Sequence, residues 1–265
     1  MRKNDYLIAA GLLFLAVFIW IRDLAWVTSS DDTLPILISL PLFVWLGMPW
    51  KWSSAPPEYS KNLLVAGVLF FCVGIGLNVT ILLTIGWVAL LSLWMQARLQ
   101  KETLPHFYKL LVLPFMAFPW VSLDFDSLGW WFRLSGAWVA ENIFSWAGFD
   151  VSREGTLLKI NGLLISIEVA CAGLNTLQSM LISGAVAAYL ILGRTIYYWF
   201  AFPFIFFMAW VANTIRILVI CAIGLLISPA FIMGPFHIWV GWFVLILMFG
   251  ICWLSLSLLE PKEEK

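Results

Sequence analysis

The stretch Leu63–Trp94, LLVAGVLFFCVGIGLNVTILLTIGWVALLSLW, contains no charged residue. The hydrocarbon core of a bilayer is about 30 Å thick, and a helix of about 20 apolar residues crosses it. The stretch is too long for one such helix, and Asn78 is the weak polar divider within it. We therefore predict two closely spaced membrane helices here, each of which satisfies its backbone hydrogen bonds internally.

The same character extends over the whole chain of 265 residues, of which 63% are hydrophobic and 11% charged. Soluble domains carry about 25% charged residues, so this composition excludes a soluble globular domain. We predict an all-α polytopic membrane protein, with residues 1–265 forming a single integral membrane domain of the cytoplasmic membrane. The lipid bilayer then surrounds it, and we expect no nucleic-acid partner.

Apolar runs predict about eight membrane spans, five within residues 1–121 and three within residues 174–265. Some runs are short for a bilayer, which tilted neighbours or protein-buried ends allow. The predicted spans are Tyr6–Ile21, Leu34–Trp50, Leu63–Leu77, Val79–Ala97, Phe107–Val121, Leu174–Leu192, Ile196–Ile215 with a continuation past Arg216, and His237–Leu258.

The basic residues indicate the orientation of these spans. With the amino terminus in the cytoplasm, ten of the 15 Lys and Arg residues fall inside and five outside. Cytoplasmic loops are enriched in Lys and Arg, so this orientation is favoured. The five outside are Arg22, Arg133, Arg153, Lys159 and Arg216.

Residues 122–173 are mixed in character and fall outside in this orientation. Gly129–Gly148 is amphipathic, and two apolar runs, Thr156–Ile160 and Leu164–Val169, flank Asn161-Gly162. Asn-Gly between two such runs is a strong signal for a two-residue β-hairpin turn. We predict a small extracytoplasmic hairpin that leads directly into the sixth span.

Three polar residues, Cys171, Arg216 and His237, interrupt or border the last apolar segments. A helix rises about 1.5 Å per residue, which places Cys171 about 34 Å and Arg216 about 33 Å from Arg194 in a cytoplasmic turn. His237 lies about 34 Å before the charged tail that opens at Glu260. Each distance is about one bilayer thickness, so we expect all three residues near the outer surface.

The path of residues 217–236 decides this placement. These residues are numerous enough to span the membrane once more, which would put His237 inside. We favour an outer kinked or re-entrant excursion, in which Pro229, Gly234 and Pro235 break the helix. A further span would expose Lys262 and Lys265 outside, against the distribution of basic residues.

The three residues fit nucleophilic catalysis. The Cys171 thiolate attacks a carbonyl, His237 accepts the thiol proton and returns it to the leaving amine, and Arg216 steadies the developing oxyanion. Asn213, one turn from Arg216, and Glu168, just before Cys171, are candidate substrate-binding residues. The four cysteines have no metal-ligand spacing, so we expect no metal and no cofactor.

A plainer interpretation exists for each residue. Cys171 could be a packing residue, Arg216 an interfacial anchor with an extended side chain, and His237 a solvated helix end. Two other functions also fit. A membrane glycan or lipid transferase would use Arg216 to bind phosphate and would not need Cys171, and a transporter would place charges at mid-bilayer.

The sequence Glu168-Val169-Ala170-Cys171-Ala172-Gly173-Leu174, followed by Asn213-Thr214-Ile215-Arg216-Ile217 and a downstream His237, resembles the exosortase/archaeosortase family. The resemblance covers mainly Gly155–Gly241, and Ala172 departs from the Ser that many members carry. It implies a membrane cysteine transpeptidase that cleaves a carboxy-terminal sorting signal of the PEP-CTERM kind on membrane-anchored proteins. Transfer to a cell-surface acceptor, with a lipid-linked acceptor as one candidate, would follow at the outer face.

Overall fold

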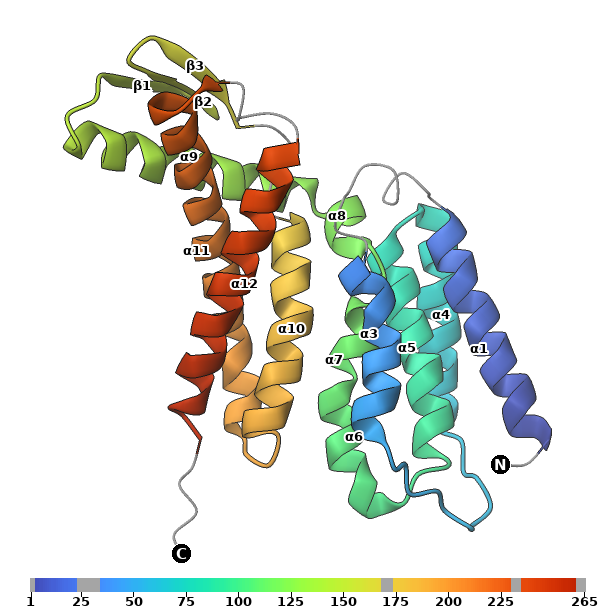
Figure 1. Cartoon of the computed structure of the whole chain (residues 1–265). Helices are drawn as coiled ribbons and strands as arrows, with labels where there is room; N and C mark the ends of the chain where they lie inside the picture. The colour runs from blue at the N-terminus through green and yellow to red at the C-terminus, as the bar shows by residue number, and fades with distance from the viewer. Residues whose placement is uncertain (1–2, 23–33, 168–173, 230–234, 261–265) are drawn as a thin grey trace, which may run out of the picture. The chain divides into compact units, whose positions relative to one another are not determined.

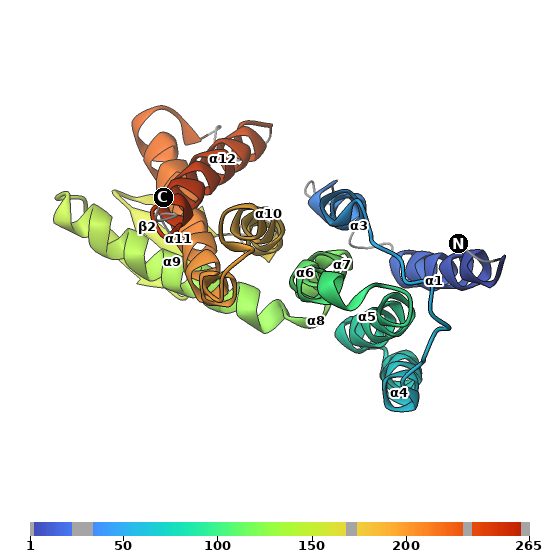
Figure 2. The same ribbon diagram turned by 90° about the horizontal axis from the view of Figure 1, so that it is seen from below.

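The computed structural model describes residues 3–22, 34–167, 174–229 and 235–260. The chain is mostly helical and divides into two compact units, Met1–Asp124 and Phe125–Lys265 (Figures 1 and 2). The mostly helical class agrees with the sequence. The interpretation of the chain as one integral membrane domain stays a prediction.

The first unit consists of helices. Its helices α4 and α5 come from the uncharged stretch Leu63–Trp94. Asn78 adopts the left-handed conformation with a φ of 58° and ends α4, and α5 begins two residues later. The elements of this unit are α1 (Lys3–Arg22), α3 (Leu34–Gly47), α4 (Lys61–Leu77), α5 (Thr80–Gln96), η1 (Lys101–Thr103), α6 (Leu104–Leu110), α7 (Val112–Met116) and α8 (Trp120–Asp124).

Glycine lets α4 and α5 approach closely. A Cβ at Gly86 of α5 would lie 2.6 Å from the backbone nitrogen of Phe71 and 2.8 Å from the carbonyl oxygen of Gly67. A Cβ at Gly74 would in turn lie 2.8 Å from the backbone nitrogen of Leu83. Small residues at such crossings are typical of helices that pack in a membrane.

Charged residues hold the ends of α1 and α5. Arg98 forms an ion pair with Asp5 at 2.6 Å, and both side chains are less than a tenth exposed. At the other end of α5, the Asp124 carboxylate accepts a hydrogen bond from the backbone N–H of Thr80 at 3.1 Å. Arg22 donates to the Thr80 hydroxyl at 2.7 Å. Such partners satisfy helix ends that would otherwise expose free backbone groups.

The predicted fifth span, Phe107–Val121, is wrong as a single helix. The structure has three short helices there, α6, α7 and α8. The chain carries Pro105, Pro114 and Pro119 in this region, and proline removes a backbone donor and clashes with the preceding turn. The apolar composition predicts one span, and the prolines divide this segment into short helices.

The second unit combines helices with a small sheet. Its elements are α9 (Asp126–Trp146), β1 (Val151–Glu154), β2 (Leu157–Ile160), β3 (Leu163–Ser166), α10 (Leu174–Leu192), α11 (Tyr197–Leu226) and α12 (Pro235–Ser257). The three strands are antiparallel in the order β1-β2-β3. Asn161 and Gly162 join β2 to β3 with φ angles of 49° and 85°. Two positive φ angles in succession are what a type I′ turn requires. That this sheet lies outside the membrane stays a prediction.

The helix that carries Arg216 runs on past that residue, as expected, and the outer excursion after it stays a prediction. Helix α11 continues without interruption for ten residues beyond Arg216, to Leu226. Helix α11 thus ends three residues before Pro229, and α12 begins at Pro235. The helix continues because the residues between Ile217 and Leu226 include no proline.

Within the described ranges, three helices are long and apolar enough to cross a membrane: Asp5–Arg22, Tyr197–Leu226 and Trp239–Ser257. Shorter apolar helices cover Ile36–Gly47, Lys61–Leu77, Thr80–Gln96 and Thr176–Leu192. Helices of this length reach across hydrocarbon only where the bilayer thins or where protein surrounds their ends. The count of eight spans stays a prediction.

Replacing Gly86 with Ala tests the close approach of α4 and α5. The new Cβ would meet backbone atoms of α4, which cannot move aside without separating the two helices. We expect the free energy of unfolding to fall by about 1–3 kcal/mol, the usual effect of overpacking. Unfolding of the purified protein in mixed detergent micelles, followed by circular dichroism, measures the change.

Gly76→Ala is the matched control, because a Cβ there would meet no atom within 4 Å. Both substitutions replace glycine by a better helix former within the same helical hairpin. Equal stability of the two variants would contradict the close approach at Gly86.

Candidate active site

Helices α10, α11 and α12 form the framework of the site. Each packs against the other two, and Figures 1 and 2 show the three side by side. A tight turn joins α10 to α11, with the N–H of Thr195 donating to the carbonyl of Leu192 at 2.9 Å. Gly184 of α10 lies against Ile205 of α11, where a Cβ would come within 2.6 Å of the Ile205 side chain.

The helix lengths bring Arg216 level with the beginning of α10. Arg216 lies 216 − 197 = 19 residues after the start of α11, which corresponds to about 29 Å along the axis. From Leu192 back to Leu174, α10 rises 192 − 174 = 18 residues, or about 27 Å. Figure 1 shows the beginnings of α10 and α12 at the end of this unit that carries the sheet.

Arg216 is buried within this framework. The residue is only 9% exposed, and its Nε has no hydrogen-bond partner among the described residues. Its guanidinium lies against Gly241 of α12, where a Cβ would come 3.0 Å from Cζ, 3.1 Å from Nε and 3.2 Å from Nη2. A buried donor without a partner is costly, so the Nε of Arg216 is a candidate to bind a group that the described residues do not supply.

Asn213 lies one turn before Arg216 on α11 and is fully buried. Neither its amide nitrogen nor its amide oxygen has a hydrogen-bond partner in the described part of the chain. The next residue, Thr214, is satisfied locally, because its hydroxyl donates to the carbonyl of Trp210 at 2.9 Å. Asn213 therefore offers one donor group and one acceptor that the helix itself does not use.

His237 occupies the first turn of α12, and its side chain lies outside the described residues. Position 237 comes four residues before Gly241, so the two positions share one side of the helix. The contact between Gly241 and the Arg216 guanidinium thus places Arg216 about one helical turn from position 237. The structure brings Arg216, Asn213 and this part of α12 together.

Cys171 and Glu168 lie outside the described residues. Ile167 is buried and its N–H donates to the carbonyl of Thr156 at 3.1 Å, and α10 begins at Leu174. Three buried polar residues follow in the first two turns of α10: Thr176, Gln178 and Ser179.

Helix α9 crosses α11 beside Arg216. A Cβ at Gly136 of α9 would lie 2.5 Å from Cδ1 of Ile217, and the next nearest atoms are Ile217 Cγ1 at 3.9 Å and Thr214 Oγ1 at 4.0 Å. One turn away, the indole N–H of Trp210 donates to the hydroxyl of Ser135 at 2.9 Å. The crossing fixes the part of α11 that carries Asn213 and Arg216.

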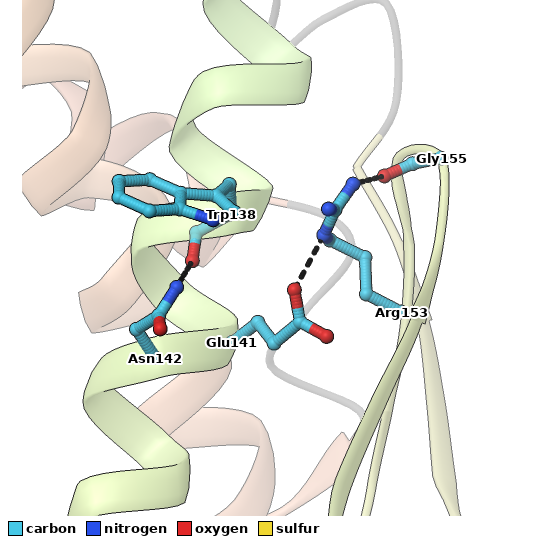
Figure 3. A network of polar contacts seen from close by, with 5 residues as sticks. All are labelled: Trp138, Glu141, Asn142, Arg153 and Gly155. Atoms are coloured by element: carbon cyan, nitrogen blue, oxygen red, sulfur yellow. Dashed lines mark hydrogen bonds and ion pairs between the residues drawn. The ribbon is translucent and has the colours of Figure 1, made fainter.

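An ion pair holds the sheet on α9 (Figure 3). The Nε of Arg153 in β1 lies 2.7 Å from Oε2 of Glu141, and its Nη1 donates to the carbonyl of Gly155 at 3.0 Å. Both charged side chains are partly exposed, so the pair contributes less than about 1 kcal/mol to stability. Its role is to orient β1 on the helix, and the sheet then leads into the segment that carries Cys171.

Gly241 and Gly136 are site residues that the sequence analysis did not identify. Glycines at helix crossings are a known pattern in membrane proteins, and that pattern could have selected both. It could not have named Arg216 and Ile217 as the neighbours, because the neighbour of a glycine depends on how the helices pack.

A family model described as a transmembrane exosortase matches residues 3–254, nearly the whole chain. No curated protein and no solved structure matches the chain.

Pairing Gly136→Ala with Ile217→Val tests the crossing that supports the site. Gly136→Ala alone places a methyl group against Ile217 Cδ1, and we expect a loss of about 1–3 kcal/mol in the free energy of unfolding. Ile217→Val removes that Cδ1 and alone costs about 0.5–1.5 kcal/mol.

In the double variant the Cβ added at position 136 takes the space of the missing Cδ1 at position 217. The loss in free energy of unfolding should therefore be smaller than the sum of the two single losses by about 1 kcal/mol or more. Unfolding of the four proteins in mixed micelles gives this coupling energy. Additive losses would show that Gly136 and Ile217 do not share the crossing.

Proposed function

We propose that the chain, which belongs to the transmembrane exosortase family, is a cysteine transpeptidase of the cytoplasmic membrane. It cleaves the carboxy-terminal sorting signal of exported, membrane-anchored proteins at the outer face and passes them to a surface acceptor. The observation that carries this proposal is the buried guanidinium of Arg216, which lies against α12 one turn from position 237 and whose Nε has no hydrogen-bond partner among the described residues.

The proposed reaction begins with the Cys171 thiol. His237 takes the thiol proton, and the thiolate sulfur forms a bond to the scissile carbonyl carbon, whose oxygen becomes anionic. The oxyanion collapses, the carbon–nitrogen bond breaks, and His237 returns the proton to the leaving amine. An acceptor amine or water then attacks the thioester and releases the thiol of Cys171.

Arg216 is suited to stabilise the oxyanion. Its guanidinium carries a permanent charge and five N–H donors, and no described residue neutralises it. A charge that finds its partner only when the carbonyl oxygen becomes anionic binds the transition state more tightly than the substrate. The low polarity around Arg216 strengthens that interaction relative to water.

Asn213 is suited to bind the substrate backbone. A peptide group presents one N–H and one carbonyl, and the buried Asn213 amide has an unused acceptor and an unused donor group. Pairing with a peptide group would remove the cost of burying that amide alone. We assign Glu168 to the substrate side of the site on its position three residues before Cys171.

Replacing Cys171 with Ala tests the nucleophile. We expect processing of a co-expressed, epitope-tagged exported protein, whose carboxy terminus carries a short motif, an apolar helix and a basic cluster, to stop. The reason is that no other group can form the acyl-enzyme, and loss of the nucleophile costs several orders of magnitude in turnover. Immunoblotting of the reporter measures processing, and immunoblotting of the enzyme shows that its amount persists.

Full processing by Cys171→Ala would sink the cysteine mechanism. It would favour a membrane glycan or lipid transferase, in which Arg216 binds phosphate and the thiol is dispensable. Cys72→Ala is the control, because this cysteine lies exposed on α4, in the first unit.

Labelling with a membrane-impermeant maleimide tests the orientation. Ser152 in β1 and Arg194 in the α10–α11 turn are both exposed, so a cysteine at either position is accessible from its own side. In a Cys171→Ala background we expect Ser152→Cys to react in intact cells and Arg194→Cys to react only after the membrane is opened. The reverse pattern would place the site on the cytoplasmic face.

A further inference from the structure

We propose that Gly241 is a positioning residue that holds the Arg216 guanidinium against α12, and this inference rests on the proposed function. The missing side chain at position 241 provides the space that the guanidinium occupies. Gly241 does not touch the reacting atoms and acts only through Arg216.

The geometry at Gly241 is specific to the charged end of Arg216. The three atoms nearest to a Cβ built on Gly241 are Cζ, Nε and Nη2, at 3.0, 3.1 and 3.2 Å. Three atoms of one planar group at nearly equal distance place the plane of the guanidinium over position 241. Nε is fully buried there, so the group has little room to withdraw.

The sequence of α12 shows that glycine at this position needs a reason. Glycine is a poor helix former, and the residues between Gly241 and Gly250 of α12 are all apolar. Gly250 lies nine residues later in the same helix, and a Cβ there would meet no atom within 4 Å. The two glycines therefore differ in surroundings and share the same helical context.

The position of Gly241 along α12 places the guanidinium close to position 237. The buried stripe of this helix includes Val240, Val244 and Met248, so Gly241 lies at the side that faces the other helices. Position 237 precedes Gly241 by four residues, which is about 6 Å along the axis. The guanidinium is thus held about one turn from the proposed general base, on the side of α12 that both positions share.

A Cβ at position 241 would displace the guanidinium by a few tenths of an ångström. Distances of 3.0–3.2 Å are shorter than ordinary carbon contacts, and the flexible end of Arg216 is the part that can move. Groups that stabilise a transition state are sensitive to such shifts, since a misplacement of about 1 Å costs about 10²-fold in rate. Binding of the substrate should change little, because its scissile carbonyl carries no charge in the ground state.

The test compares Gly241→Ala with Gly250→Ala in the full-length enzyme reconstituted in liposomes. The probe is a tagged exported protein whose carboxy terminus carries a short motif, an apolar helix and a basic cluster, and initial rates are measured over a range of its concentrations. We expect Gly241→Ala to lower kcat about tenfold with KM unchanged. We expect Gly250→Ala to match the wild-type enzyme.

Arg216→Lys separates positioning from a general structural effect. Lysine keeps the charge and lacks the planar group that lies over Gly241. In an Arg216→Lys background, Gly241→Ala should therefore lower kcat less than twofold. A merely structural defect would lower kcat by the same factor in both backgrounds.

Three outcomes would overturn the inference: wild-type kcat in Gly241→Ala, an equal loss in both backgrounds, or a rise in KM alone. Thermal unfolding of each variant identifies a protein that has failed to fold, and a Gly241→Ala enzyme that does not fold would be a fourth such outcome, because the inference requires the flexible end of Arg216 to yield to the new methyl group. Failure of the proposed function is recognised separately, because Cys171→Ala would then process the same probe.

Discussion

Close approach of helices at glycine is the constraint on which both units depend. Apolar helices in lipid gain little from the hydrophobic effect when they associate. Small residues instead let the backbones approach closely, and the resulting van der Waals contacts stabilise the packing. Gly86 serves α4 and α5, Gly136 serves α9 and α11, and Gly184 serves α10 and α11. At these positions the neighbouring space holds backbone or apolar side chain. At Gly241 the neighbouring space holds the Arg216 guanidinium, so a glycine at this helix crossing positions a charged group.

The two buried arginines show how a structural charge differs from a proposed functional one. Arg98 is compensated by Asp5 at 2.6 Å, so the pair can be kept for the packing of the first unit. Arg216 is buried to a similar degree and has no such partner among the described residues. The Nε of each lacks a hydrogen-bond partner among the described residues, and only Arg98 has an ion-pair partner there, which offsets part of its desolvation cost. That asymmetry favours a role for Arg216 in binding a transient negative charge.

Much of the helical architecture could be predicted from the sequence, because hydrocarbon leaves the backbone few alternatives. Composition predicted a helical membrane protein, and Asn78 marked the division between α4 and α5. The fifth span failed because hydropathy averages over prolines, and the prolines divided that segment into short helices. The helix that carries Arg216 continues to Leu226 because its next turns are apolar and free of proline, and it ends before Pro229.

The candidate site was predictable to the extent that its residues are unusual in an apolar chain. Asn213 and Arg216 stand out in α11 because polar side chains are costly in hydrocarbon and are therefore often functional. Both are buried, and polar atoms of both lack hydrogen-bond partners among the described residues. Gly241 has no chemistry of its own and could not be found that way. Its importance arises only when α12 packs on α11, because the helix register then joins position 237, the glycine and the guanidinium. A catalytic arrangement in a membrane bundle can therefore depend as much on where a side chain is missing as on the groups that react.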